Sequence, residues 1–105
     1  MSEPPTSAPI RWRYFTSRQV AEARAWAAAG GAAVHENIFK SRGRRTCHLL
    51  APDEAALVAA AVSVGCKPWW IQRTRTVHFD LVESQLHNAL AQCPNYPPDR
   101  SPTGP

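Results

Sequence analysis

Hydrophobic and polar residues alternate along residues 10–15, the first stretch of the chain with a clear pattern. Ile10, Trp12 and Tyr14 fall on one side of residues 10–15, and arginines stand between them. This period of two predicts a strand with one face toward a core. Further apolar or alternating runs predict four more strands, at residues 32–39, 45–50, 69–72 and 77–81.

Apolar residues recur at helical spacing in three other stretches. The first begins with a T-x-x-Q capping box at Thr16 and Gln19. It should end at Gly30, because glycine accepts the left-handed backbone that closes a helix. The second stretch stops at Gly65, and the third ends before Pro94, which cannot continue a helix. The predicted helices therefore run from about Ser17 to Gly30, from Pro52 to Gly65 and from about Leu81 to Gln92.

The order of these elements is β-α-β-β-α-β, followed by a further strand and helix. The first six match a split βαβ, or ferredoxin-like, arrangement, so we predict an α+β domain with that sheet and an extra C-terminal strand and helix. Most of the ten prolines lie outside residues 10–93, and such ends bury too little apolar surface to become ordered. We therefore expect a single domain at residues 10–93, a disordered tail at residues 1–9 and a proline-rich disordered tail at residues 94–105.

The three cysteines, Cys47, Cys66 and Cys93, include no C-x-x-C pair. An odd number of cysteines does not suit a disulfide framework, so we expect reduced thiols in a cytoplasmic protein. The sequence has no apolar run of the ~18 residues that a membrane span needs. Residues 1–9 lack the basic and apolar regions of a secretion signal, so we expect no association with a membrane.

The chain has a formal net charge of +4, and much of the positive excess is local. The run at residues 40–45 contains a glycine flanked by arginines and predicts an exposed turn. Its positive field would attract a phosphate-bearing partner or an acidic protein surface, although a solvated hairpin tip would have the same sequence. The candidate anion-binding side chains are Arg42, Arg44, Arg45, Arg73 and Arg75.

A second group of polar residues follows from strand alternation. Apolar residues occupy one face of the last predicted strand, which leaves His78 and Asp80 together on the other. His48 and Gln72 lie on neighbouring predicted strands, so the four side chains could line one cleft. A carboxylate orients an imidazole and raises its basicity, which suits acid–base chemistry near neutral pH. The candidate catalytic residues are His48, His78 and Asp80, and Gln72 is a candidate ligand-binding residue.

Each of these residues also has a structural interpretation. Asp80 could cap the last helix, because it begins an Asp-x-x-Glu sequence. His48 could be a core histidine bonded to the backbone, His78 a half-exposed strand residue, and Gln72 a partner for a strand edge. His35 is expected to be an ordinary surface residue.

A metal site is a further alternative. His48, His78 and Asp80 could form a three-ligand set with an open position. Cys47, however, lies on the opposite strand face from His48, so the two are not expected to share an ion. We expect neither a bound metal nor a cofactor.

The second half of the chain contains several motifs at recognisable intervals. They are His48-Leu49-Leu50-Ala51, a helix that ends in Gly65, Trp70-Ile71-Gln72 and His78-Phe79-Asp80-Leu81. Residues 47–92 are similar to domain-of-unknown-function family 4031, which consists of small bacterial and phage proteins. The family pattern resembles His-Leu-x-Ala-Asp, a helix ending in glycine, Trp-Phe/Tyr-Gln and His-Tyr-Asp-Leu. The resemblance implies that the characteristic polar positions of the family are occupied in this chain by His48, Trp70, Gln72, His78 and Asp80.

The sequence departs from that family pattern at three positions. Pro52 stands where the pattern has an aspartate, with Asp53 one place later. Ala56 stands where a glutamate is usual, and Leu86 where a basic residue is usual. If these positions belong to an active centre, the protein would bind a ligand without turning it over. The family has no activity to carry across, so the resemblance implies a site without its chemistry.

Together these patterns predict a small domain that binds a phosphate-bearing ligand, a nucleotide or a nucleic acid, through its polar face and basic turns. Trp69 or Trp70 would stack on a base, as aromatic side chains do in sites for single-stranded nucleic acid. One alternative is a small acid–base enzyme that uses His78 with Asp80 and His48. Another is a phage-type interaction or inhibitor module whose basic surface binds an acidic protein.

Overall fold

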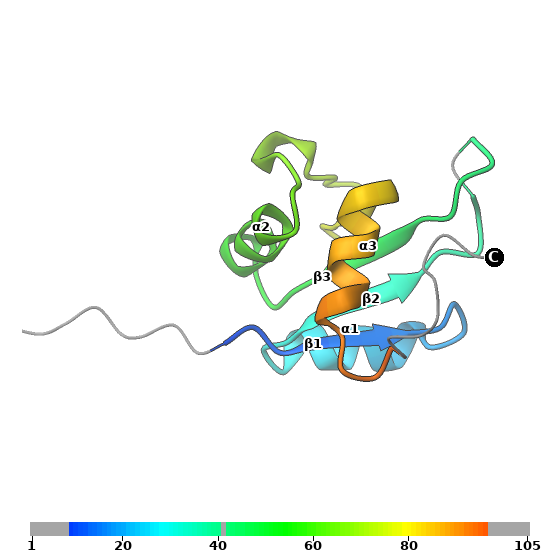
Figure 1. The fold of residues 1–105 in the computed structure, drawn as a ribbon. Helices are drawn as coiled ribbons and strands as arrows, with labels where there is room; N and C mark the ends of the chain where they lie inside the picture. The colour runs from blue at the N-terminus through cyan, green and yellow to red at the C-terminus, as the bar shows by residue number, and fades with distance from the viewer. Residues whose placement is uncertain (1–8, 41, 97–105) are drawn as a thin grey trace, which may run out of the picture.

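The computed structural model describes residues 9–40 and 42–96, and Figure 1 shows how their helices and strands are arranged. The strands are β1 (Trp12–Phe15), β2 (Ala32–Glu36), β3 (Cys47–Leu50) and β4 (Phe79–Leu81). The helices are α1 (Val20–Ala28), α2 (Glu54–Ser63), α3 (Glu83–Gln92) and a short 3-10 helix, η1 (Pro68–Trp70). The three predicted α-helices are confirmed. None of the helices in these described residues has the length and apolar character needed to cross a membrane.

The four strands form one mixed sheet in the order β1-β2-β3-β4. β1 and β2 are parallel and are connected by α1, whereas β3 is antiparallel to both of its neighbours. The α+β class is therefore confirmed. The ferredoxin-like arrangement is not confirmed, because a split βαβ has another strand between its two parallel strands. Here β1 and β2 are direct neighbours, with Trp12 opposite Ala32.

The predicted strand at residues 69–72 is wrong. Pro68 occupies the first turn of η1, where its ring fixes a helical φ angle and its missing N–H loses no helix bond. The chain turns there instead of extending, and Trp69 is left 74% exposed. Of the predicted strand, Gln72 keeps a strand-like pairing, a single antiparallel bridge with His78.

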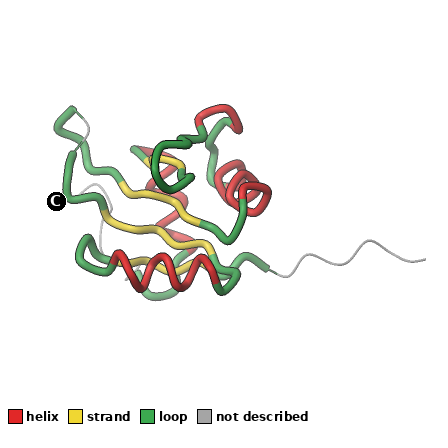
Figure 2. Tube along the Cα trace, turned by 180° about the vertical axis from the view of Figure 1, so that it is seen from behind, coloured by secondary structure: helices red, strands yellow, loops and turns green. Residues whose placement is uncertain are grey.

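The sheet separates two layers of apolar side chains. In Figure 1 α3 lies in front of the sheet and α1 behind it, and Figure 2 shows α1 from the other side. The strand residues in the layer beneath α2 and α3 are Trp12, Ala32, Val34, Cys47, Leu49, Phe79 and Leu81. The smaller layer beneath α1 consists of Phe15, Ala23, Ala27, Ala33 and Leu50, with Trp26 packed against them.

Residues 94–96 belong to the folded domain, although the sequence placed them in a tail. Tyr96 is 5% exposed, and its ring packs edge-on against Tyr14 with 4.9 Å between centroids. The side chain of Asn95 bonds the free edge of β1: its Oδ1 accepts from the backbone N–H of Tyr14, and its Nδ2 donates to the Tyr14 carbonyl, both at 2.8 Å. The amide thus satisfies an edge strand as a neighbouring strand would. Almost all the other residues of the predicted tails lie outside the described residues.

Replacing Asn95 with alanine should lower the free energy of unfolding by about 1–3 kcal/mol. The change removes two hydrogen bonds, each of which contributes about 0.5–1.5 kcal/mol. Urea unfolding followed by circular dichroism measures the difference. Gln92→Ala, which truncates an exposed amide at the end of α3, is the control and should change stability by less than about 0.5 kcal/mol. Equal stability of the wild type and Asn95→Ala would contradict this role.

The three cysteines are free and lie in the layer beneath α2 and α3. Burial raises the pKa of the Cys66 thiol to about 11 and that of the Cys93 thiol to about 12. Burial also raises the pKa of Cys47. All three thiols are therefore protonated at neutral pH and act as small apolar core residues.

Candidate functional site

Polar residues form a row across the α1 face of the sheet. The register pairs His35 of β2 with His48 of β3, and His48 with Asp80 of β4. Residues directly opposed on neighbouring strands point to the same face, so these three side chains stand side by side. His78 precedes Asp80 by two residues and shares its face. The structure thus brings together the three candidate catalytic residues.

Asp80 lies close to both imidazoles. Its Oδ1 is 3.5 Å from Nε2 of His48 and 3.3 Å from Nε2 of His78. The two rings are 4.7 Å apart between centroids. The side chain of Asp80 is 47% exposed and that of His48 32% exposed, so a ligand can reach them from solvent. We call His48, His78 and Asp80 the His–Asp cluster.

Hydrogen bonds fix the orientation of both imidazoles. Nδ1 of His78 lies 2.7 Å from the carbonyl oxygen of Thr76, so this nitrogen carries a proton and donates it. Oδ1 of Asn37 accepts from the backbone N–H of Phe39 at 3.1 Å. This bond turns the amide nitrogen of Asn37 toward Nε2 of His48, at 3.4 Å. In the neutral form of each ring, Nε2 therefore carries a lone pair.

The environment keeps His48 neutral. Burial lowers its pKa below the ordinary value of 6.5, and the imidazole of His78 lowers it further. The carboxylate of Asp80 raises the pKa but does not outweigh the other two effects. His48 therefore offers an unprotonated ring nitrogen at physiological pH.

The capping interpretation of Asp80 is wrong. α3 begins at Glu83, and its N-cap residue is Val82, whose side chain makes no capping hydrogen bond. Asp80 lies inside β4, between the fully buried side chains of Phe79 and Leu81. Because side chains alternate along a strand, the carboxylate points to the opposite face of the sheet, where the imidazoles are.

A hollow of about 300 Å³ opens beside the His–Asp cluster. α1 packs mainly against β1 and β2, so the hollow lies between this helix, the sheet and the loop at residues 73–76. Arg24 of α1 reaches the loop and donates from Nη2 to the hydroxyl of Thr76 at 3.4 Å. The lining residues are Val20, Arg24, His35, His48, Leu50, Thr74, Arg75, Thr76 and His78.

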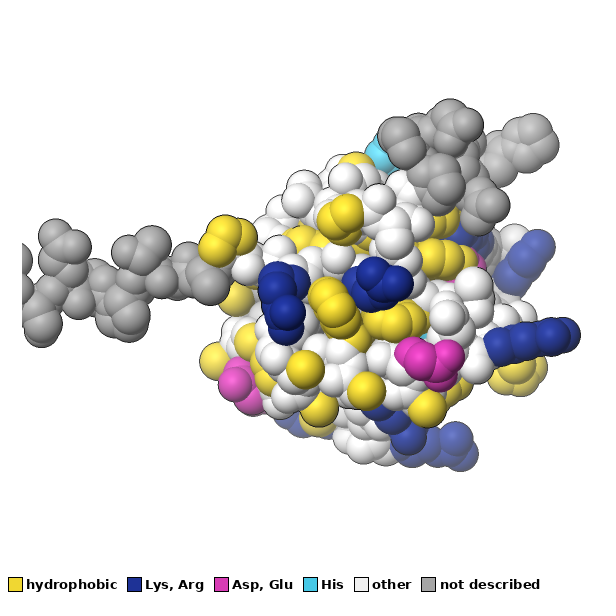
Figure 3. Space-filling model, turned by 90° about the horizontal axis from the view of Figure 1, so that it is seen from below, with side chains coloured by type: hydrophobic (Ala, Val, Ile, Leu, Met, Phe, Trp, Pro, Cys, Tyr) yellow, Lys and Arg dark blue, Asp and Glu magenta, His cyan; other side chains and the backbone are white. Residues whose placement is uncertain are grey.

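The five candidate arginines are not gathered at one site. Arg75 lines the hollow. Arg44 forms a salt bridge with Glu83 at the start of α3, and Arg73 forms one with Glu54 at the start of α2. The face of the molecule in Figure 3 likewise has basic side chains spread among apolar and uncharged ones, with no continuous basic stripe on that face.

Arg45 takes part in a structural network on the other face of the sheet. Its Nε donates to the two carboxylate oxygens of Glu36 at 2.9 and 3.1 Å, and its Nη1 donates to the hydroxyl of Tyr96 at 3.2 Å. Glu36 also accepts from the hydroxyl of Tyr14 at 2.9 Å. Arg42 lies exposed in the same turn, with a left-handed φ of 53°. Arg45 is therefore fixed by the fold, whereas Arg42 projects from it.

Gln72 and Trp70 lie outside the lining of the hollow. Gln72 exchanges two backbone hydrogen bonds with His78, at 2.8 and 3.0 Å, and so positions the backbone that carries this imidazole. Trp70 lies in η1, which packs against α2, and is 43% exposed. The stacking of a base on Trp70 stays a prediction.

Sequence reasoning missed several side chains of the hollow, among them His35 and Arg24. His35 was expected at the surface but is 9% exposed, and its Nε2 donates to the carbonyl of Ser17 at 3.3 Å. Alternation contained the signal for His35, because Ala33 shares its face and is fully buried. The place of Arg24 depends on how α1 crosses the sheet, which no local pattern encodes.

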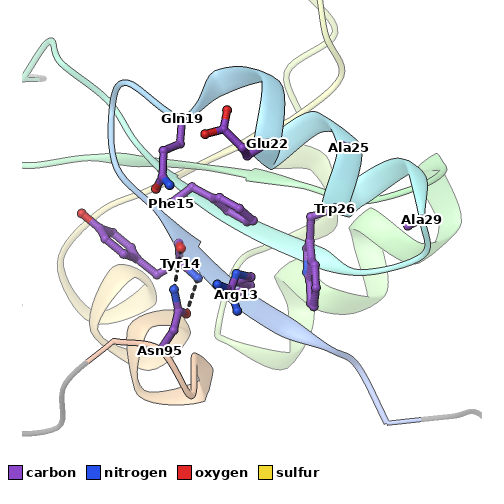
Figure 4. Close-up of a pocket in the computed structure, with 9 residues that line it drawn as sticks. All are labelled: Arg13, Tyr14, Phe15, Gln19, Glu22, Ala25, Trp26, Ala29 and Asn95. Atoms are coloured by element: carbon purple, nitrogen blue, oxygen red, sulfur yellow. Dashed lines mark hydrogen bonds between the residues drawn. The ribbon is translucent and has the colours of Figure 1, made fainter.

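A second hollow, of about 450 Å³, lies between β1 and α1 at the edge of the sheet (Figure 4). Asn95 there is bonded to the backbone of Tyr14. The guanidinium of Arg13 lies over the rings of Phe15 and Trp26, at 5.9 and 5.6 Å from their centroids. Asn95 and Arg13 thus have structural partners in this hollow, and we assign the functional site to the smaller hollow.

Comparisons with known proteins gave no match. No protein-family model, no curated protein and no solved structure was found to match the chain. The resemblance of residues 47–92 to domain-of-unknown-function family 4031 therefore stays a prediction. The geometry of the site is the basis on which a function can be proposed.

Proposed function

We propose that the hollow beside the His–Asp cluster binds a small phosphate-bearing ligand of about nucleotide size. The observation that carries this proposal is that two arginines line one hollow, Arg24 from α1 and Arg75 from the loop. Guanidinium groups bind phosphate through charge-assisted, often paired hydrogen bonds. The hydroxyl of Thr74 and the imidazole of His78 add further polar groups to the same lining.

The loop that carries Arg75 is shaped by the fold. Arg75 has a left-handed φ of 56°, which residues with a side chain seldom adopt. Its neighbour Thr76 is bonded through its hydroxyl to Arg24 and through its carbonyl to His78. Such strained conformations persist where their surroundings hold them, and they are frequent at ligand sites. Because the loop is already held in place, the free-energy cost of ordering it when a ligand binds is smaller.

The dimensions favour a nucleotide over a nucleic acid. A volume of about 300 Å³ is at the lower end for sites that enclose small molecules. A nucleic-acid strand would instead use cations spread along its backbone. Arg44, Arg45 and Arg73 each form a salt bridge with a carboxylate, which reduces their value for such a surface.

Two other expectations from the sequence stay predictions. The free thiols support a reducing, cytoplasmic compartment. The interaction-module alternative has its support in Ile38 and Phe39, which are 68% and 73% exposed beside the basic turn.

Arg24→Gln and Arg75→Gln should each weaken the binding of adenosine monophosphate about tenfold or more. A hydrogen bond to a charged group contributes about 1.5–3 kcal/mol, and about 1.4 kcal/mol corresponds to a factor of ten. Isothermal titration calorimetry at low ionic strength measures the affinities. Arg42→Gln makes the same change of charge at an exposed position outside the hollow, and its affinity should stay within a factor of about two of the wild type.

Two results would overturn this proposal. The first is a wild-type protein that binds neither adenosine monophosphate nor pyrophosphate. The second is a loss of affinity in Arg42→Gln as large as in Arg24→Gln, because that would indicate diffuse attraction by net charge.

A second candidate function is acid–base catalysis on the bound ligand. The position of Asp80 Oδ1, at 3.3 Å from His78 and 3.5 Å from His48, favours it. A carboxylate so placed stabilises a proton on an imidazole, which can then pass it to a substrate. His78→Gln should abolish the turnover of a phosphate ester that the wild type hydrolyses, while His87→Gln on the exposed side of α3 should not. A wild type that turns over no phosphate ester would remove this candidate.

A further inference from the structure

We propose that the His–Asp cluster holds a divalent transition-metal ion of the zinc type. The ligands would be Nε2 of His48, Nε2 of His78 and Oδ1 of Asp80. Both histidines also line the hollow, so a fourth coordination position would be open to a ligand there. The sequence alone led us to expect no metal, and the arrangement of the three side chains in space is what changes that expectation.

The distances fit ligands around one ion. Zinc binds imidazole nitrogen and carboxylate oxygen at about 2.0–2.2 Å, so two ligand atoms at a tetrahedral angle lie about 3.3–3.5 Å apart. Oδ1 of Asp80 is 3.5 Å from Nε2 of His48 and 3.3 Å from Nε2 of His78. Three candidate ligand atoms, one from each residue, all lie within 4.8 Å of one another. Small side-chain rotations would complete the set.

The hydrogen bonds make the centre of the cluster electron-rich. Nδ1 of His78 donates to Thr76, so Nε2 of the neutral ring presents a lone pair. The amide of Asn37, held by its bond to Phe39, donates toward Nε2 of His48, which therefore also presents a lone pair. Both lone pairs meet the same carboxylate oxygen. Three such atoms repel one another unless a cation lies between them.

A metal ion satisfies this arrangement better than a proton does. A proton bridges one nitrogen and one oxygen, whereas an ion accepts all three lone pairs together. The bond from His78 Nδ1 to the Thr76 carbonyl is the kind of outer contact that orients metal-bound histidines. The contact between Asn37 and His48 is long, at 3.4 Å, so an ion can replace it.

The ligand chemistry selects the class of ion. Two imidazoles and one carboxylate suit zinc and neighbouring transition metals, while magnesium and calcium prefer oxygen ligands throughout. The buried Cys47 alternates to the opposite face of β3 from His48, so the site has nitrogen and oxygen ligands without sulfur. Three protein ligands and one open position are typical of zinc sites that bind a substrate or its analogue.

The metal would give the site a second means of holding an anion. A phosphate oxygen could take the open coordination position while Arg24 and Arg75 bind the other oxygens. This part of the inference rests on the proposed function. The binding of the ion itself does not, because its three ligands need no anion to be in place.

Titration of the metal-free full-length protein with Zn²⁺ and with Co²⁺, in a phosphate-free buffer, tests the inference. We expect one equivalent of Zn²⁺ to bind, with no competition from excess Mg²⁺. The Co²⁺ complex should show the visible absorption of a four- or five-coordinate site and no charge-transfer band from a thiolate. His48→Gln, His78→Gln and Asp80→Asn should each weaken Zn²⁺ binding by at least roughly tenfold. Loss of a residue that only orients a metal ligand already weakens binding about tenfold, and each of these variants loses a ligand itself.

His87→Gln is the matched control, because His87 is an exposed histidine of α3 outside the cluster. Its affinity for Zn²⁺ should equal that of the wild type. Asp80→Asn keeps the size of a half-exposed side chain, so circular dichroism should show an intact fold. Absence of stoichiometric Zn²⁺ binding, or an equal loss in His87→Gln, would overturn the inference. Since the titration contains no phosphate, its failure would leave the phosphate-binding proposal standing.

Discussion

Phe79→Ala should lower the free energy of unfolding by about 3–5 kcal/mol, the range for removing a phenyl ring from a core. Phe79 is 0% exposed and belongs to the layer beneath α2 and α3. Its truncation removes buried apolar surface and leaves a cavity that the surrounding side chains fill incompletely. Because domains are stable by only about 5–15 kcal/mol, this is a large part of the total.

The control for this change lies in the same stretch of chain. Val77 precedes Phe79 by two residues and is 37% exposed, so Val77→Ala should cost less than about 1 kcal/mol. Urea unfolding at neutral pH compares the two variants. The loss of Phe79 should also make the side chain of Asp80 more mobile. The buried neighbours Phe79 and Leu81 hold the backbone of Asp80 in β4. Equal losses in the two variants would contradict the packing described for β4.

Glu36→Gln should lower the free energy of unfolding by about 1.5–3 kcal/mol, the contribution of a hydrogen bond to a charged group. The carboxylate accepts hydrogen bonds from Arg45 and from the hydroxyl of Tyr14, and its side chain is 19% exposed. Glutamine keeps the shape but leaves the half-buried guanidinium of Arg45 without its opposite charge. Gln92→Ala again serves as the exposed control.

The stability that Glu36 contributes should depend on pH. Burial alone would raise the pKa of Glu36, but the hydrogen bonds from Arg45 and Tyr14 outweigh it and hold the pKa below its ordinary value of 4.5. The contribution is therefore complete above about pH 4.5 and is lost as the pH falls through the lower value of the folded state. Unfolding curves between about pH 3 and pH 7 should converge for the wild type and Glu36→Gln at the acid end. A constant difference between them would contradict this account.

Local patterns in the sequence were enough to predict most of the elements. Gly30 and Gly65 predicted where two helices end, because C-terminal caps depend on a few neighbouring residues. The T-x-x-Q box predicted a helix start at about Ser17, but α1 begins at Val20, and the bond from the backbone N–H of Thr16 to Oε1 of Gln19 lies in the turn before it. The error at residues 69–72 has a local cause: two tryptophans suggested a strand, but Pro68 directs the chain into a 3-10 turn. The ferredoxin-like strand order expected from the sequence is not confirmed, because strand order depends on packing between distant elements.

The site was predicted only in part, because local patterns place some of its residues and packing between distant segments places the others. Alternation placed His78 and Asp80 on one face, and this face lies beside His48 in the sheet. The hollow depends on Arg24, which reaches the loop from a helix more than forty residues earlier in the sequence. Such a contact has no signature in either segment alone.

The most direct test of the central claim is a nuclear magnetic resonance titration of the isotope-labelled protein with adenosine monophosphate. We predict that the largest chemical-shift changes occur at the ring nuclei of His48 and His78, at the backbone of residues 74–76 and at the guanidinium of Arg24. The indole of Trp26 in the second hollow should change little. Shifts concentrated at Arg42 or Trp26, with the two histidines unaffected, would contradict the assignment of this hollow as the ligand site.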